Sequence, residues 1–125
     1  MASETRRLRG SKAHADGAWA ETLAVWWLRM KGYRILARRY RVAAGEIDLV
    51  ARRGNTLVAV EVKRRFGLRE AMESLRAEQQ QRILRVLEGF AAQHGFQDQV
   101  LRCDMIAVIP GKWPIHLADA WQERV

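Results

Sequence analysis

The sequence has very little cysteine, with Cys103 as the single example in 125 residues. One thiol cannot form an internal disulfide or a cysteine-rich metal cluster, which excludes a disulfide-stabilised secreted domain. Long apolar runs are also missing, because polar residues interrupt the most hydrophobic stretch, residues 18–30, which is too short to cross a bilayer. No apolar core and cleavage site follow the basic N-terminus, so we expect no secretory signal and a cytoplasmic protein without membrane contact.

Acidic residues are outnumbered, with 14 aspartates and glutamates against 22 lysines and arginines and a formal net charge of +8. A basic surface of this kind attracts polyanions, of which nucleic acid is the commonest in a cell. The sequence has no pattern of a recognition helix, a zinc finger or a base-stacking platform, so base-specific readout is not predicted. We therefore expect any contact with nucleic acid to involve its backbone or its shape.

The length fits one domain, and 49% apolar residues are enough for one sizeable core. The start of the chain is polar and basic, and we predict a flexible basic arm over residues 1–12. A single domain is predicted over residues 13–125, since no internal repeat or low-complexity linker divides it.

Hydrophobic periodicity predicts an α/β domain in which a mixed central sheet is flanked by helices. Helical spacing covers residues 15–30, with Asp16 as N-cap and Gly32 as the stop, and returns over residues 70–93, with Gly95 as C-cap. β-prone runs predict strands over residues 33–42, 46–51, 56–63 and 100–109, and a short last strand over residues 115–117.

The hairpin made by the second and third of these strands carries the most informative pattern. A two-residue turn at residues 54–55 fixes its register, which sets Asp48 opposite Glu61 and Glu46 opposite Lys63. Residues two apart in a strand share a face, so these four side chains are expected together on one face. The apolar neighbours are expected on the other face: Ile47, Leu49, Val60 and Val62.

Two carboxylates directly across a sheet repel each other, and Glu46 can pair with Lys63 while Asp48 and Glu61 remain adjacent like charges. A hard divalent cation such as Mg²⁺ resolves this conflict. Lys63 beside the metal could orient a water or stabilise charge on a phosphate, which metal-assisted phosphodiester hydrolysis requires. The alternative is a solvated polar face on which the same side chains form cross-strand salt bridges.

Asp48 followed by Glu61-Val62-Lys63 resembles the D…(D/E)-x-K signature of the PD-(D/E)XK nuclease superfamily. More narrowly, the chain resembles the YraN-like bacterial family, which consists of predicted endonucleases distantly related to archaeal Holliday-junction resolvases. The matching segments cover most of the chain and comprise residues 17–21, 32–36, 45–51, 60–65 and 102–106. The resemblance implies a single PD-(D/E)XK (restriction-endonuclease-like) domain.

The resemblance also implies roles for individual residues. Asp48 and Glu61 would ligate Mg²⁺ or Mn²⁺, and Lys63 would act on the attacking water or the scissile phosphate. A first-helix glutamate joins the site in resolvase-like relatives, and Glu21 is the matching position here, with an edge-of-core carboxylate as the alternative. Glu46 matches the family's Gly-Glu-Ile-Asp sequence and is expected to pair with Lys63 and hold it in place.

The chain departs from the family at residues 79–80, where a Lys-Gln pair is common and Gln79-Gln80 stands here. The change removes a candidate phosphate contact, and we expect a solvated pair of glutamines, with a hydrogen bond from Gln80 near the site as the alternative.

Basic residues cluster on both sides of the acidic hairpin, although a solubilising surface would explain any one of them. The candidate nucleic-acid-binding residues are Arg38, Arg39, Arg41, Arg64 and Arg65. Arginine–phosphate contacts give sequence-independent affinity that falls with salt. DNA is therefore the expected partner, and a homodimer is expected only by analogy with resolvase-like relatives.

Other residues receive less specific predictions. Three tryptophans of the first predicted helix are expected to pack rather than to stack on bases: Trp19, Trp26 and Trp27. His116 is expected to be structural or at the surface, and Asp104 is a further candidate carboxylate.

The leading functional prediction is a Mg²⁺- or Mn²⁺-dependent endonuclease that cleaves DNA, branched or single-stranded. The alternative is a non-catalytic nucleic-acid-binding module that works through a partner protein. A purely structural role is the third hypothesis, and it predicts that neither nucleic acid nor metal binds.

Overall fold

The computed structural model of the chain describes residues 17–120. The predicted basic arm and the predicted N-cap at Asp16 lie outside the described residues. The elements in chain order are a helix over residues 17–30, β1 (Arg34–Val42), β2 (Gly45–Arg53), β3 (Thr56–Arg64), α2 (Leu68–Glu73), α3 (Ala77–His94), β4 (Val100–Val108) and β5 (Ile115–Leu117). Within residues 17–120, no helix is long and apolar enough to cross a membrane.

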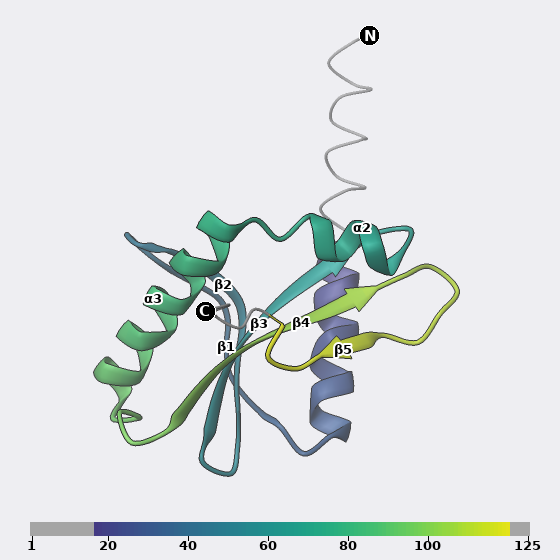
Figure 1. Cartoon of the computed structure of the whole chain (residues 1–125). Coiled ribbons are helices and arrows are strands. Elements are labelled where there is room, and N and C mark those ends of the chain that lie inside the picture. The colour runs from purple at the N-terminus through teal and green to yellow at the C-terminus, as the bar shows by residue number, and fades with distance from the viewer. Residues whose placement is uncertain (1–16, 121–125) are drawn as a thin grey trace, which may run out of the picture.

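The five strands form one sheet in the order β1-β2-β3-β4-β5. Neighbouring strands are antiparallel except for β3 and β4, which run parallel. Parallel strands need a long crossover connection, and α2 and α3 supply it here (Figure 1). The predicted mixed sheet with flanking helices is therefore confirmed.

The sheet carries a separate hydrophobic core on each face. On one face, α3 contributes Ile83, Leu87 and Phe90 to a buried cluster. On the other face, the helix over residues 17–30 contributes Ala24 and Leu28. Figure 1 shows the two helices on opposite sides of the sheet, which is thereby covered on both faces.

The helix over residues 17–30 buries one narrow face, on which Ala20 and Ala24 lie in the core on this side of the sheet. Trp19 and Trp26 point away from that face and are 64% and 60% exposed. The expectation that they pack is therefore wrong for both. Trp27 is partly buried and stacks on Trp113, with 6.0 Å between the ring centroids.

The single helix predicted over residues 70–93 is two helices, because the chain leaves helical geometry between α2 and α3. Arg76 is extended, with φ −82° and ψ 151°. The hydroxyl of Ser74 donates to the carbonyl of Ala71 at 2.6 Å and closes the end of α2. The predicted stop at Gly95 is confirmed by its left-handed conformation, with φ 77°.

Candidate active site

The register of the acidic hairpin follows the prediction over its first five pairs. The pairs run from Arg53↔Thr56, beside the turn, to Leu49↔Val60. Beyond that point no further backbone pair joins β2 and β3 among the described residues. The backbone N–H of Val62 instead donates to Oδ2 of Asp48 at 2.9 Å. The Asp48 side chain thus takes the place of a backbone acceptor at the position where the two strands separate.

The irregularity at Asp48 extends to β1. Arg39 has a positive φ of 49° and lies between the β1–β2 pairs Arg38↔Leu49 and Tyr40↔Ile47. Ile47 packs in the core on the α3 side, whereas Leu49 packs on the side of the helix over residues 17–30. The prediction that Ile47 and Leu49 share a face is wrong, because strand alternation is interrupted between them.

The carboxyls of Asp48 and Glu61 share a hydrogen bond. Burial and the neighbouring charge of Asp48 raise the pKa of Glu61 to about 8, in spite of the nearby ammonium of Lys63. Burial also raises the pKa of Asp48, and the charge of Glu21 acts in the same direction. These two carboxyls, which the sequence placed opposite each other, thus hold a proton more tightly than free carboxyls do.

Lys63 and Gln79 both contact Oε1 of Glu61, each at 3.3 Å. The Lys63 side chain is only 14% exposed, so its ammonium is held close to the carboxyl pair. Gln79 reaches the site from α3, on which it precedes the buried Ile83 by one turn. The expectation of a solvated pair of glutamines is therefore wrong: Gln80 also has a partner, since its amide donates to the carbonyl of Leu75 at 3.1 Å.

Glu46 does not pair with Lys63, which corrects that prediction. Its Oε2 contacts Nη2 of Arg41 at 3.2 Å, across the β1–β2 pair. The separation of β2 from β3 after Leu49 explains the change, because it removes the cross-strand neighbour that the regular ladder would have given Glu46.

Glu21 is buried, with only 7% of its surface exposed. Its two carboxylate oxygens accept from Nε of Arg38 at 3.4 Å and Nε of Arg39 at 3.2 Å. Its charge contributes to the raised pKa of Asp48, so the two carboxylates lie within electrostatic reach. Glu21 therefore joins the site through charge and through the arginines that flank it.

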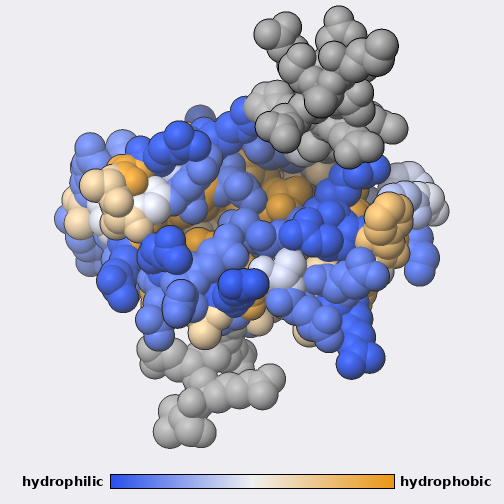
Figure 2. Space-filling view, turned by 90° about the horizontal axis from the view of Figure 1, so that it is seen from above, coloured by the Kyte–Doolittle hydropathy of each residue, from blue (hydrophilic) through white to orange (hydrophobic). Residues whose placement is uncertain are grey.

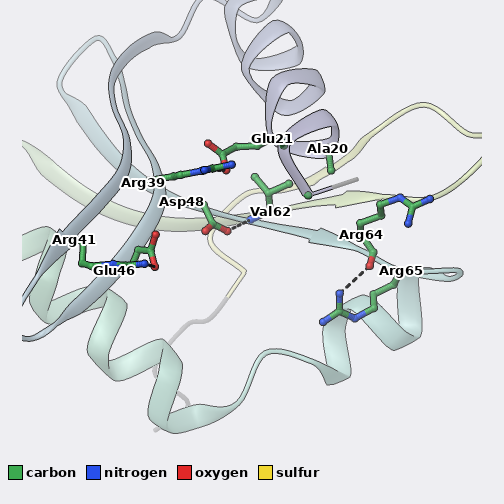
Figure 3. A pocket seen from close by; sticks show the side chains of 11 residues that line it. Ala20, Glu21, Arg39, Arg41, Glu46, Asp48, Val62, Arg64 and Arg65 are labelled. Carbon is green, nitrogen blue, oxygen red and sulfur yellow. Dashed lines mark hydrogen bonds and ion pairs between the residues drawn. The ribbon is translucent and has the colours of Figure 1, made fainter. Parts of the chain in front are cut away.

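A pocket of about 580 Å³ opens over Asp48. Figure 3 shows Glu21 and Arg39 beside each other near Asp48, with Arg41 and Glu46 to one side. The charged residues that line the pocket are Glu21, Arg39, Arg41, Glu46, Asp48, Arg64 and Arg65. Of the predicted arginines, Arg38 is not among the lining residues.

The surface around this end of the sheet is mostly hydrophilic. Figure 2 looks down on the molecule from the top of Figure 1, where β3 ends and α2 lies, and it shows mostly polar side chains, with apolar ones in hollows between them and in small patches at the sides. Basic residues on such a surface remain open to solvent and to a polyanion.

The donor set at the carboxyl pair fits a hard divalent cation. Within residues 17–120, no three histidine, cysteine, aspartate or glutamate side chains come together as a cation site. Asp48 and Glu61 therefore offer two carboxylates, and Mg²⁺ commonly takes one or two while keeping several waters. A cation would replace the proton that these carboxyls now share, which fits the raised pKa of each.

Comparison with known proteins places the chain in a family. Residues 20–108 match the model of "Uncharacterised protein family UPF0102". The chain belongs to the UPF0102 family. The match spans the helix over residues 17–30 almost completely and continues through β4, so it includes every residue of the acidic site.

Individual UPF0102 proteins are similar over nearly the whole chain. One from Caulobacter vibrioides is 43% identical over 122 residues, which are 97% of this chain and 98% of the relative. One from Parvibaculum lavamentivorans is 48% identical over 90% of this chain and 86% of the relative. One from Maricaulis maris is 49% identical over 88% of this chain and 87% of the relative. The predicted YraN-like relationship is thereby confirmed at the level of the UPF0102 family.

Gln79 was expected to be solvated, but it contacts Glu61. Helical spacing could have indicated this position, since residues four apart on a helix share a face and Ile83 is buried. The UPF0102 site therefore draws on both helical layers: Glu21 comes from one face of the sheet and Gln79 from the other.

Proposed function

We propose that this UPF0102 protein is a metal-dependent endonuclease of the PD-(D/E)XK type that hydrolyses phosphodiester bonds in DNA. The contact between the half-buried carboxyl of Asp48 and the buried carboxyl of Glu61 carries the proposal. When both groups are ionised they carry two negative charges, and Lys63 balances only one of them, so the pair can attract a cation of the kind that a nuclease site requires.

Asp48 and Glu61 would hold the Mg²⁺ or Mn²⁺ ion. When bound, the cation supplies positive charge that stabilises a phosphoryl group during hydrolysis. Glu61 also accepts from Gln79 and Lys63, and these contacts keep its carboxylate in one orientation.

Lys63 is the residue that we assign to the phosphate. An ammonium has three N–H donors, so Lys63 can keep its contact with Glu61 and still donate to a phosphate oxygen. Hydrolysis adds the oxygen of water to phosphorus and breaks one phosphorus–oxygen ester bond, and the leaving oxygen takes up a proton. Negative charge grows on the phosphoryl oxygens during this step, and the Lys63 ammonium stabilises it.

The arginines around the pocket would bind the DNA backbone. Arg39 and Arg41 are held by Glu21 and Glu46, which fixes their positions at the rim. No aromatic ring is among the described residues that line the pocket, so nothing there would stack on an extruded base. The substrate contact that fits this lining is to phosphates, which suits a site that recognises DNA by shape.

The alternative is a nucleic-acid-binding module that works through a partner protein. The observation in its favour is that the described residues provide only two carboxylates in direct contact, without a third ligand beside them. Such a module would bind nucleic acid without cleaving it and would act through the partner.

The test compares wild-type protein with Asp48→Asn, which removes one charge and keeps the shape of the side chain. Glu88→Gln is the matched control, because Glu88 is exposed on α3. Each protein is incubated at low salt with labelled duplex, single-stranded and four-way-junction DNA in Mg²⁺, Mn²⁺ or chelator. We expect metal-dependent cleavage by the wild type and the control, and none by Asp48→Asn.

Binding without cleavage in every metal would reject the endonuclease and favour the binding module. Cleavage that survives Asp48→Asn would assign the activity to another site or to a contaminant. Sedimentation of the wild type with and without junction DNA would test the expected homodimer.

A further inference from the structure

A second polar pocket lies at the other end of β2, beside the turn that joins it to β3. It has a volume of about 350 Å³, and its lining residues are Lys31, Tyr33, Arg53, Arg102, His116 and Ala118. None of these residues lines the pocket over Asp48. Arg53 is five residues from Asp48 along β2, so about 17 Å of strand separates the two positions.

Asp104 is fully buried and contacts two of the lining residues, Arg102 and His116. It accepts from Nε and Nη2 of Arg102 at 2.8 Å each, from Nε2 of His116 at 2.7 Å and from the backbone N–H of Asp119 at 2.8 Å. Burial alone would raise the pKa of Asp104, but the hydrogen bonds from His116 and Arg102 lower it. Both oxygens of the Asp104 carboxylate are thus already engaged by residues of the protein.

The imidazole of His116 contacts Asp104 through one ring nitrogen and Lys31 through the other. With Nε2–H donated to Asp104, Nδ1 of a neutral ring is an acceptor, and Nζ of Lys31 lies 3.0 Å from it. The His116 side chain is 4% exposed, so the ring is fixed from both sides. The Lys31 ammonium uses one of its three donors here and keeps two.

Tyr33 and Arg53 add further donors. The hydroxyl oxygen of Tyr33 accepts from Nη2 of Arg102 at 2.6 Å, so the hydroxyl hydrogen remains to be donated. The guanidinium of Arg53 lies over the Tyr33 ring, 4.4 Å from its centroid, and Nη1 donates to the carbonyl of Lys31 at 3.2 Å. A guanidinium has five N–H donors, and this contact engages one of them.

The pocket therefore has more donors and more positive charge than its own acceptors can use. Lys31, Arg53 and Arg102 carry three positive charges, and Asp104 carries one negative charge, which leaves an excess of two. Nη1 of Arg102 has no partner among the described residues, because the contacts to Asp104 and Tyr33 use the other two nitrogens. A ligand that fits is an anion with several acceptor oxygens and a charge near −2.

We propose that this pocket binds a phosphate group, either free or at the end of a nucleic-acid strand. A phosphate monoester has three acceptor oxygens and a charge of about −1.5 to −2 at pH 7, which matches the excess of donors and charge. Lys31 and Arg53 contact the phosphate, and the Arg102–Asp104–His116 network holds the pocket in shape. A carboxylate has one charge and two oxygens, so it matches the same groups less well.

The test titrates inorganic phosphate into ¹⁵N-labelled wild-type protein without divalent metal, at constant ionic strength against chloride. We expect saturable shifts of the backbone amides of Tyr33, Arg53 and Ala118. In the double variant Lys31→Gln/Arg53→Gln, the affinity read from these amides should fall about tenfold or more, as for loss of a charge-assisted hydrogen bond. Arg85→Gln, which removes an exposed arginine from α3 on the other face of the sheet, should bind as the wild type does.

Two further arms distinguish the sources of the phosphate. A short oligonucleotide with a 5′-phosphate is compared with the same strand without it, again read from the pocket amides. Tighter binding of the phosphorylated strand, lost in the double variant, assigns a nucleic-acid end. Binding of inorganic phosphate without that preference assigns a free small phosphate. The single variant Lys31→Gln repeats the measurement at an exposed side chain, so a folding defect of the double variant does not decide the outcome.

No saturable shift at the pocket amides would overturn the proposal, as would equal phosphate affinity in the wild type and in both variants. The phosphate titration is repeated in Asp48→Asn, so that binding at this pocket is judged separately from the endonuclease proposal. Phosphate binding that persists in Asp48→Asn supports the second pocket whether or not the protein cleaves DNA.

Discussion

Replacing Glu61 with glutamine should remove a pH-dependent destabilisation that the carboxyl pair imposes on the folded protein. Burial and the charge of Asp48 raise the pKa of Glu61 from 4.5 to about 8. Below pH 4.5 the group is protonated in the folded and unfolded states alike. Between pH 4.5 and 8 the unfolded chain releases this proton while the folded protein keeps it, so the free energy of unfolding falls as the pH rises.

The size of the effect follows from the same two pKa values. A difference of about 3.5 at about 1.4 kcal/mol per unit gives about 5 kcal/mol for a group that titrates alone. Asp48 competes for the same proton, and Lys63 offsets part of the charge, so we expect about half of this between pH 5 and 8. In Glu61→Gln, Asp48 and Lys63 together carry the same net charge as the singly protonated pair and Lys63 carry in the wild type. The free energy of unfolding of this variant should therefore not fall over this pH range.

Urea denaturation followed by tryptophan fluorescence from pH 5 to 8 measures the slope directly. Glu88→Gln is the control and should keep the wild-type slope, because Glu88 is exposed on α3. Adding Mg²⁺ at pH 8 should stabilise the wild type and leave Glu61→Gln almost unchanged, since the cation replaces the shared proton. Equal slopes in the wild type and Glu61→Gln would refute the assignment of a shared proton to this pair.

Three further predictions concern other parts of the molecule. Asp104→Asn should lower the free energy of unfolding by about 3–5 kcal/mol, measured in urea against Glu88→Gln, because it removes the buried charged partner of the half-buried Arg102. A loss below about 1 kcal/mol would contradict this role. Leu28→Ala should lower the free energy of unfolding by about 2–5 kcal/mol, because Leu28 is fully buried. Trp26→Ala should change it by no more than about 0.5 kcal/mol, because Trp26 is 60% exposed. Similar losses in both variants would disprove the assigned helix face. Glu21→Gln should change the free energy of unfolding by less than about 1 kcal/mol. It should make DNA binding more salt-dependent, because it releases the two arginines that contact Glu21. An unchanged dependence of affinity on salt in filter binding would count against those arginines as phosphate contacts.

The sequence by itself determined the acidic hairpin. Strand alternation and a two-residue turn at residues 54–55 are local signals, and they were sufficient to fix the register from Arg53↔Thr56 to Leu49↔Val60. That register brought Asp48 next to Glu61 without knowledge of any other element. The mixed sheet and the left-handed Gly95 also followed from local pattern.

Only the tertiary structure decided which partners these residues have. Whether Glu46 meets Lys63 or Arg41 depends on where β2 leaves β3, and the bond from Val62 to the Asp48 side chain sets that point. The outward direction of Trp26 depends on which face of its helix meets the sheet, since both faces carry apolar residues. The contact between Gln79 and Glu61 requires α3 to be docked. These features join segments far apart in the chain, and periodicity reports only the shape of each segment by itself.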